Sequence, residues 1–222
     1  FEKKEGEDTW MYLILECIPG KNLQEAMDAG WRPCQQEVRA LAIQALDALQ
    51  YLQQLAPPLI HRDIKPSNLI WHEQRLSLID FGAVQDMMRP EGSSTIVGTF
   101  GYMAPEQFSG RAVPASDLYA LGATLVHLLS GRSPSEIPQR ELRLDFRDYV
   151  TCAEPLCQWL ERMLEPMTEY RFQRAEEAKA ALLNEQVQPV TPATPPRSAQ
   201  RATGQTTGPL EPMFKPMGSK VE

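Results

Sequence analysis

Apolar residues recur along the chain with two different periods, which predict several helices and a few short strands. Between Gln35 and Leu55 they return every three or four positions, as in an amphipathic helix with one buried face. The stretch from Leu118 to Leu129 is apolar on every side and stops at Gly131, as expected of a central core helix. Two further helices are predicted at Pro155 to Glu165 and at Ala175 to Leu183.

Shorter apolar runs that are rich in β-forming residues predict strands. They lie at Trp10 to Ile18, Leu59-Ile60, Leu69 to Trp71 and Leu76 to Ile79. Glu73-Gln74 stands between the last two runs and is expected to turn them into a hairpin. Because helices dominate and the strands are few and short, the pattern predicts an α+β fold.

Two segments follow neither period. The loop from Gly82 to Ser109 has 28 residues rich in Gly, Ser and Thr, which is longer than a mere connector, so we expect it to be functional. Residues 185–222 contain seven prolines and few large apolar residues, so we expect a disordered tail. The tail could join this part to a further domain, or its Pro-x-x-Pro spacings could bind an aromatic groove of a partner; we favour the linker.

Composition excludes several classes of protein. The 222 residues carry a net charge of −7, which argues against a nucleic-acid-binding surface. The longest strongly apolar stretch has about 12 residues, too few for a membrane span. The four cysteines form no C-x-x-C pair, so a zinc site is not expected. We expect reduced, mostly buried thiols, rather than two disulfides, in a cytoplasmic protein.

Three oxygen-bearing side chains lie beside the short apolar runs: Asp63, Asn68 and Asp80. Carboxylate and amide oxygens suit Mg²⁺, which is commonly shared with substrate phosphates, so Asn68 and Asp80 are candidate ligands. Asp63 is then available to accept a proton from an attacking hydroxyl, and Lys65 can neutralise charge on a transferring phosphoryl group. This set of groups is typical of phosphoryl transfer.

Three motifs give these residues a family context. His61 to Asn68 matches the catalytic-loop pattern H-R-D-L-x-x-x-N, with Ile64 in place of Leu; Asp80 to Gly82 is D-F-G; and Ala104 to Glu106 is A-P-E. In this order and spacing, the motifs show that the chain resembles eukaryotic-like, bacterial-type serine/threonine protein kinases from about Trp10 to Asn184. The resemblance implies a protein-kinase-like fold, ATP and Mg²⁺ as cofactors, and serine or threonine residues of proteins as substrates.

The resemblance also implies roles for single residues. Glu16 to Ile18 is similar to the hinge that holds adenine, with Leu15 as gatekeeper. Asn22 is similar to a residue beside the ribose, and Ile70 to the floor of the adenine site. The residues implied to brace the site or to regulate it are His61, Phe81, Gly82, Glu106, Asp117 and Arg171 (structural) and Arg62, Thr95 and Thr99 (regulatory).

Some of these roles come with an expected contact. His61 is expected to hydrogen-bond near the D-F-G motif, and Asp117 to brace the backbone of the catalytic loop. Arg171 is expected to pair with Glu106. Thr95 falls where the family carries its activating phosphothreonine, which could pair with Arg62. Thr99 is expected to face the catalytic aspartate, Asp63, and to help select hydroxyl substrates.

The family also requires a Gly-rich loop, a lysine and a glutamate before the hinge, and residues 1–14 contain none of these features. We therefore expect a truncated kinase domain over 1–184, with an N-lobe remnant and hinge at 1–18 and a mainly helical C-lobe at 19–184. The chain alone is then expected to be inactive, as a fragment of a protein kinase. The alternatives are a catalytically inactive scaffold of the same fold and a small-molecule phosphotransferase; the long segment 82–106 counts against the latter.

Overall fold

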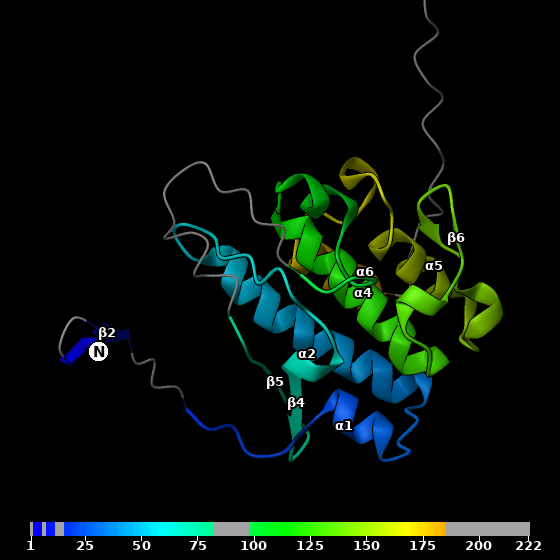
Figure 1. Ribbon diagram of the computed structural model, residues 1–222. Helices are drawn as coiled ribbons and strands as arrows, with labels where there is room; N and C mark the ends of the chain where they lie inside the picture. Colours follow the sequence, from blue (N-terminus) through cyan, green and yellow to red (C-terminus); the bar gives the residue numbers. More distant parts are fainter. Residues whose placement is uncertain (1, 6–7, 12–15, 82–97, 185–222) are drawn as a thin grey trace, which may run out of the picture. The chain divides into compact units, whose positions relative to one another are not determined.

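The computed structural model describes residues 2–5, 8–11, 16–81 and 98–184, and the side chains from residue 16 onward (Figure 1). Its long helices are α2 (Gln35–Gln54), α4 (Pro114–Ser130), α5 (Glu154–Met163) and α6 (Ala175–Asn184). All four were predicted from periodicity. Leu15, Gly82, Thr95 and the tail 185–222 lie outside the described residues, so their predictions remain untested.

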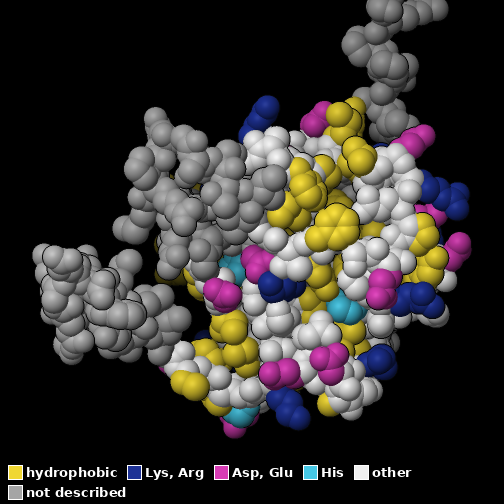
Figure 2. Space-filling view, viewed as in Figure 1, with side chains coloured by type: hydrophobic (Ala, Val, Ile, Leu, Met, Phe, Trp, Pro, Cys, Tyr) yellow, Lys and Arg dark blue, Asp and Glu magenta, His cyan; other side chains and the backbone are white. Residues whose placement is uncertain are grey.

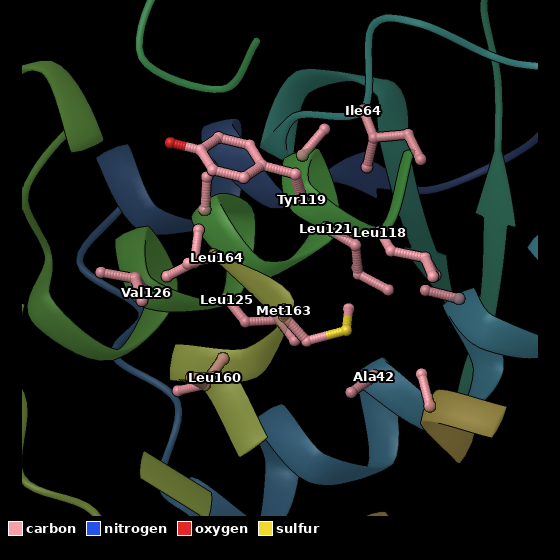
Figure 3. Close-up of a cluster of buried hydrophobic side chains, with 14 of the residues drawn as sticks. Ala42, Ile64, Leu118, Tyr119, Leu121, Leu125, Val126, Leu160, Met163 and Leu164 are labelled. Carbon is pink, nitrogen blue, oxygen red and sulfur yellow. The ribbon is translucent and has the colours of Figure 1, made fainter. Parts of the chain in front are cut away.

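Helix α4 forms the centre of the core, as its apolar sequence predicted. It packs against α2 and α5, and α6 contacts α2 and α5 in turn. Figure 3 shows Leu118, Leu121 and Leu125 of α4 in one cluster with Leu160 and Met163 of α5, and all five are buried. Close packing of α4 on α5 depends on a glycine within α4. A Cβ on Gly122 would lie only 2.9 Å from Cβ of Met163.

The strands form three small antiparallel sheets. The first pairs β1 (Glu2–Glu5) with β2 (Asp8–Met11), the second orders β3 (Lys21–Asn22), β4 (Leu69–His72) and β5 (Arg75–Leu78), and the third pairs β6 (Gln139–Arg140) with β7 (Arg143–Leu144). The predicted turn at Glu73-Gln74 joins β4 to β5, and both of its residues have positive φ, at 46° and 64°. The predicted hairpin, which links the catalytic-loop motif to D-F-G, is therefore present.

Two strand predictions were too generous. Of the strand predicted at Trp10 to Ile18, β2 contains Trp10 and Met11, residues 12–15 lie outside the described residues, and residues 16–18 have no regular structure. Leu59-Ile60 is not a strand, because the Leu59 N–H donates to the carbonyl of Leu52 (3.1 Å) and turns the chain back onto the end of α2. Both runs are apolar, but among their described residues only Trp10 and Met11 pair with a neighbouring strand, β1.

The short helix α1 (Leu23–Asp28) was missed, although its start carries a recognisable signal. Asn22 Oδ1 accepts from the N–H of Glu25 (2.8 Å), and the Glu25 carboxylate accepts from the N–H of Asn22 (3.2 Å). This reciprocal pair is a capping box, which the sequence Asn-Leu-Gln-Glu indicates before an apolar face becomes visible.

The cysteine prediction was wrong. Cys152 and Cys157 form a disulfide at the start of α5, whereas Cys17 and Cys34 are free and exposed rather than buried. The spacing of five residues is not a recognised motif. Cys152 lies just before α5 and Cys157 in its first turn, which places their Cα atoms 6.2 Å apart.

Among the described residues, no helix has the length and apolar character of a membrane span, and no cluster of three or more His, Cys, Asp or Glu side chains could hold a metal ion. On the face shown in Figure 2, basic and acidic side chains are interspersed.

A buried ion pair joins the segment before α4 to the segment after α5. Arg171 is 1% exposed, and its Nη1 lies 2.8 Å from Glu106 Oε1. Its remaining N–H groups donate to the backbone carbonyls of Glu165, Ala115 and Pro166 and to Glu106 Oε2. All five guanidinium N–H groups therefore have acceptors, and the ion pair predicted from the sequence is present.

We expect Glu106→Ala to destabilise the fold strongly, because it leaves a buried guanidinium without its counter-charge. Removing one partner of a buried pair typically costs about 3–5 kcal/mol, which lowers the melting temperature of a domain of this size by roughly 10 °C. Glu154→Ala is the matched control, since Glu154 pairs with Arg147 on the surface, and a much smaller shift is expected. Equal shifts in a thermal melt of the two variants would contradict this account.

Candidate active site

The buried carboxylate of Asp117 fixes the backbone of the loop that holds the candidate catalytic residues. Its two oxygens accept from the backbone N–H groups of His61 and Arg62, each at 2.8 Å. Arg62 has a positive φ of 70°, and its carbonyl accepts from Gln107 Nε2 (3.0 Å). Burial raises the pKa of Asp117 to about 6, although the two N–H bonds act in the opposite direction.

His61 joins this loop to the strand end that carries Asp80. Its Nε2 lies 3.0 Å from the carbonyl of Ile79, and its Nδ1 accepts from the N–H of Asp63 at 3.4 Å. Only a neutral ring with the proton on Nε2 can make both bonds, and burial lowers the pKa of His61 in agreement. The ring also packs on Phe81, with centroids 4.9 Å apart. The expected contact near D-F-G is therefore present.

Asp63 stands at the centre of a compact polar network. Its Oδ2 lies 2.7 Å from Lys65 Nζ and 3.1 Å from Asn68 Nδ2, and its Oδ1 accepts from the Thr99 hydroxyl at 2.7 Å. Lys65 Nζ also donates to Thr99 Oγ1 (2.7 Å). Thr99 therefore faces Asp63, as the sequence predicted, and a hydroxyl lies at hydrogen-bond distance from the carboxylate.

Two opposing effects set the proton affinity of Asp63. Burial raises its pKa, but the hydrogen bonds from Lys65, Thr99 and Asn68 together outweigh burial and leave the pKa below its usual value. The carboxylate is therefore ionised at neutral pH. It can orient a hydroxyl and accept its proton as that proton becomes acidic during reaction.

Asn68 and Asp80 present the donor set that a magnesium ion prefers. Asn68 Nδ2 donates to Asp63 through both the backbone carbonyl (2.8 Å) and Oδ2, which fixes the orientation of the amide. Its Oδ1 then has only a long contact of 3.5 Å from Ser67 Oγ among the described residues. The Ile79 N–H donates to the backbone carbonyl of Asn68 (3.0 Å). Asp80 is the next residue, so this hydrogen bond holds its backbone close to Asn68. One amide and one carboxylate oxygen fit Mg²⁺.

The predicted adenine-side residues are brought together only in part. Asn22 and Ile70 are paired across β3 and β4, so they lie side by side. Glu16 is exposed and Ile18 half-buried in a segment without regular structure. The Asn22 side chain caps α1, a structural role that the sequence reading did not assign.

Sequence reasoning missed three residues that position the site. Gln107 links two segments, because its Nε2 donates to the Arg62 carbonyl and its Oε1 accepts from the Ala104 N–H. Tyr102 and His127 form a buried hydrogen-bonded pair. A polar residue beside A-P-E and a histidine inside an apolar helix were the available signals.

Comparison with known proteins gives the same picture as the geometry. Residues 2–183 match the protein kinase domain family. The chain belongs to the protein kinase family. It is 34% identical to serine/threonine-protein kinase B of Synechocystis sp., over 79% of this chain and 33% of that kinase. It is 32% identical to serine/threonine-protein kinase D of Synechocystis sp., over 96% of this chain and 45% of that kinase.

A third relative is serine/threonine-protein kinase PknA of Nostoc sp., at 38% identity over 59% of this chain and 24% of PknA. The chain spans a third to less than half of the length of the two Synechocystis kinases. These relatives are bacterial-type serine/threonine kinases, as the motifs predicted.

We expect a pH dependence of kinase-domain stability that is specific to Asp117. Because its folded pKa of about 6 lies above the usual 3.8, the folded state binds the proton more tightly than the unfolded state does. Its contribution to stability is therefore fully present below about pH 4 and is lost as the pH rises through about 6. The shift corresponds to roughly 3 kcal/mol.

Urea unfolding of wild type and Asp117→Asn at several pH values measures this contribution. Between pH 4 and pH 7, the free energy of unfolding of the wild type should fall relative to that of the variant. Asp148→Asn, at an exposed position, should leave the pH trend unchanged. A wild-type advantage that grows over this interval would show that the folded pKa of Asp117 lies below its usual value.

Proposed function

We propose that the protein transfers the γ-phosphate of ATP to serine and threonine hydroxyls of protein substrates. The observation that carries this proposal is the network around Asp63, in which a low-pKa carboxylate, an ammonium group and a threonine hydroxyl meet within 2.7 Å contacts. The Thr99 hydroxyl shows that a hydroxyl group can reach Asp63 Oδ1. An attacking hydroxyl can occupy the same position. Family membership supports the same reaction.

Asp63 is the proposed catalytic base. It orients the attacking hydroxyl and accepts its proton, which needs a hydrogen-bond contact and an ionised carboxylate. Lys65 contacts the same carboxylate, and the one N–H that is not directed to Asp63 or Thr99 is available to the oxygens of the transferring phosphoryl group, where negative charge must be neutralised. Phosphoryl transfer relies almost entirely on such positioning and charge neutralisation.

The proposed magnesium ligands are Asn68 Oδ1 and the Asp80 carboxylate. Bound Mg²⁺ supplies charge neutralisation on the phosphates of ATP. The residues of the chain do the rest: Asn68 keeps its amide oriented through Asp63, and His61 holds the backbone just before Asp80. Adenine is proposed to contact the backbone of Glu16 to Ile18 and the side of Ile70, with Leu15 next to it and Asn22 near the ribose.

The remaining proposals follow from the family. Residues 1–184 form a kinase domain whose first 18 residues contain N-lobe strands and the hinge, and 185–222 is a linker or a partner-binding tail. Arg62 is proposed to bind a phosphate group on Thr95. Because the reaction consumes ATP and modifies proteins, we propose that it occurs in the cytoplasm.

Replacement of Asp63 by Asn tests the proposal in the full-length protein. Asp63→Asn keeps the shape and loses the base, so kcat should fall by about 10²- to 10⁴-fold, while calorimetry shows nearly unchanged Mg-ATP binding. Asp80→Asn should also weaken Mg-ATP binding, because it removes a metal ligand. A radioactive-phosphate assay on a library of serine- and threonine-containing peptides measures the transfer.

Asp148→Asn removes an exposed carboxylate and should leave both kcat and ATP binding unchanged. Near-wild-type transfer by Asp63→Asn, with contaminating kinases excluded, would rule out the assigned base. Wild-type protein that binds ATP but phosphorylates no peptide would instead favour the inactive scaffold.

A further inference from the structure

A buried tyrosine–histidine pair lies outside the network around Asp63. The hydroxyl of Tyr102 and Nδ1 of His127 are 2.6 Å apart, and both residues are 7% exposed. Tyr102 belongs to the turn that precedes A-P-E, whereas His127 lies in the last turn of α4. The pair therefore ties the candidate substrate-facing segment to the central helix of the domain.

The direction of this hydrogen bond follows from the surroundings. Burial raises the pKa of Tyr102 to about 12, so the phenol keeps its proton. A protonated phenol that donates to the lone pair of a neutral imidazole satisfies both groups, so we assign Tyr102 as the donor. His127 Nδ1 is then the acceptor, and its ring is neutral with the proton on Nε2.

Charged groups from three segments face His127. Glu136 lies in the 3-10 helix η3 (Pro134–Glu136), Asp28 at the end of α1, and Arg32 in the segment that follows α1. Burial lowers the pKa of His127, Glu136 and Asp28 raise it, and Arg32 lowers it; burial prevails. The imidazole is therefore neutral near pH 7 and gains a proton only below the usual range of histidine.

Tyr102 controls the position of Thr99 through a short backbone link. The N–H groups of Tyr102 and Met103 both donate to the carbonyl of Thr99, at 3.1 Å each. Within this turn Gly101 has a φ of +92°, and a Cβ there would lie 3.0 Å from the backbone nitrogen of Ser135. The turn thus fits closely against the segment after α4. The Tyr102 side chain also holds the turn through its hydrogen bond to His127.

We propose that His127 is a positioning residue for phosphoryl transfer, which acts by accepting the Tyr102 hydroxyl and so holding Thr99 against Asp63. This inference rests on the proposed function. The sequence of contacts is continuous: His127 Nδ1 to Tyr102 hydroxyl, Tyr102 N–H to Thr99 carbonyl, and Thr99 hydroxyl to Asp63 Oδ1.

Acid should disrupt this arrangement. A proton on Nδ1 removes the acceptor, so the Tyr102 hydroxyl must turn away from the imidazolium. The turn that carries Thr99 then loses its anchor, and the contact with Asp63 loosens. The expected result is an acid-side fall in kcat that belongs to His127.

Kinetics of the full-length protein from pH 5.5 to 8.5 test the proposal. His127→Asn places an amide oxygen near the position of Nδ1, so kcat at pH 7.5 should stay within about threefold of wild type. Because asparagine cannot titrate, the part of the acid-side decrease in kcat that belongs to His127 should disappear. Tyr102→Phe and His127→Leu remove the bond. Each should lower kcat about tenfold, since a buried polar group loses its partner, with KM for ATP unchanged.

The double variant Tyr102→Phe/His127→Leu should lose no more activity than either single variant, because both remove the same bond. His72→Asn is the matched control, since His72 is exposed at the β4–β5 turn and should leave the pH profile unchanged. An unaltered pH profile in His127→Asn, together with wild-type kcat in Tyr102→Phe, would overturn the proposal.

A second measurement does not depend on activity. In nuclear magnetic resonance titrations, the ring of His127 should be neutral at pH 7, and the methyl resonance of Thr99 should shift with the same midpoint as His127. In Tyr102→Phe the Thr99 methyl should no longer follow. A Thr99 methyl that ignores His127 in the wild type overturns the inference even if the kinase is active, whereas an inactive wild type with the coupled shifts overturns only the proposed function.

Discussion

The structure of the candidate active site depends on one buried carboxylate. Asp117 lies in the first turn of the central helix, where no solvent competes for it, and it binds the consecutive backbone N–H groups of His61 and Arg62. Two fixed N–H groups determine the path of the loop at that point. Asp63 follows immediately, so its distance to Lys65, Asn68 and Thr99 is set from the helix core rather than by the loop itself. Arg62 can adopt its unfavourable left-handed conformation because both its N–H and its carbonyl are held.

The network around Asp63 balances two requirements that oppose each other. A base that is too strongly stabilised as the anion would hold a proton poorly, and a base without donors would be protonated by burial. Here desolvation raises the pKa of Asp63, whereas Lys65, Thr99 and Asn68 lower it. The donors also fix both oxygens in position. In the proposed reaction a substrate hydroxyl competes with Thr99 for Oδ1, so the contact that stabilises the resting carboxylate also marks the proposed position of the substrate hydroxyl.

Sequence reasoning succeeded where the signal was local or periodic. The long helices followed from apolar spacing, the β4–β5 hairpin from two apolar runs and a turn, and the contact of Glu106 with Arg171 from motif resemblance. It failed where tertiary contacts decided the outcome. Leu59-Ile60 looks like a strand until α2 supplies the carbonyl of Leu52. The Cys152–Cys157 pair likewise depends on how the chain enters α5, which no spacing rule encodes.

The segment that ends in A-P-E is held at three points, which explains how a loop can carry a precise site. Arg171 binds Glu106, the Arg62 carbonyl accepts from Gln107, and His127 binds Tyr102. Two of these anchors reach elements beyond the loops of the site, namely α4 and the segment after α5. Thr99 lies only three residues before Tyr102, so little freedom remains for its side chain. The contact between Thr99 and Asp63 is therefore a property of the helical core, and a change in that core can act on catalysis without touching a substrate.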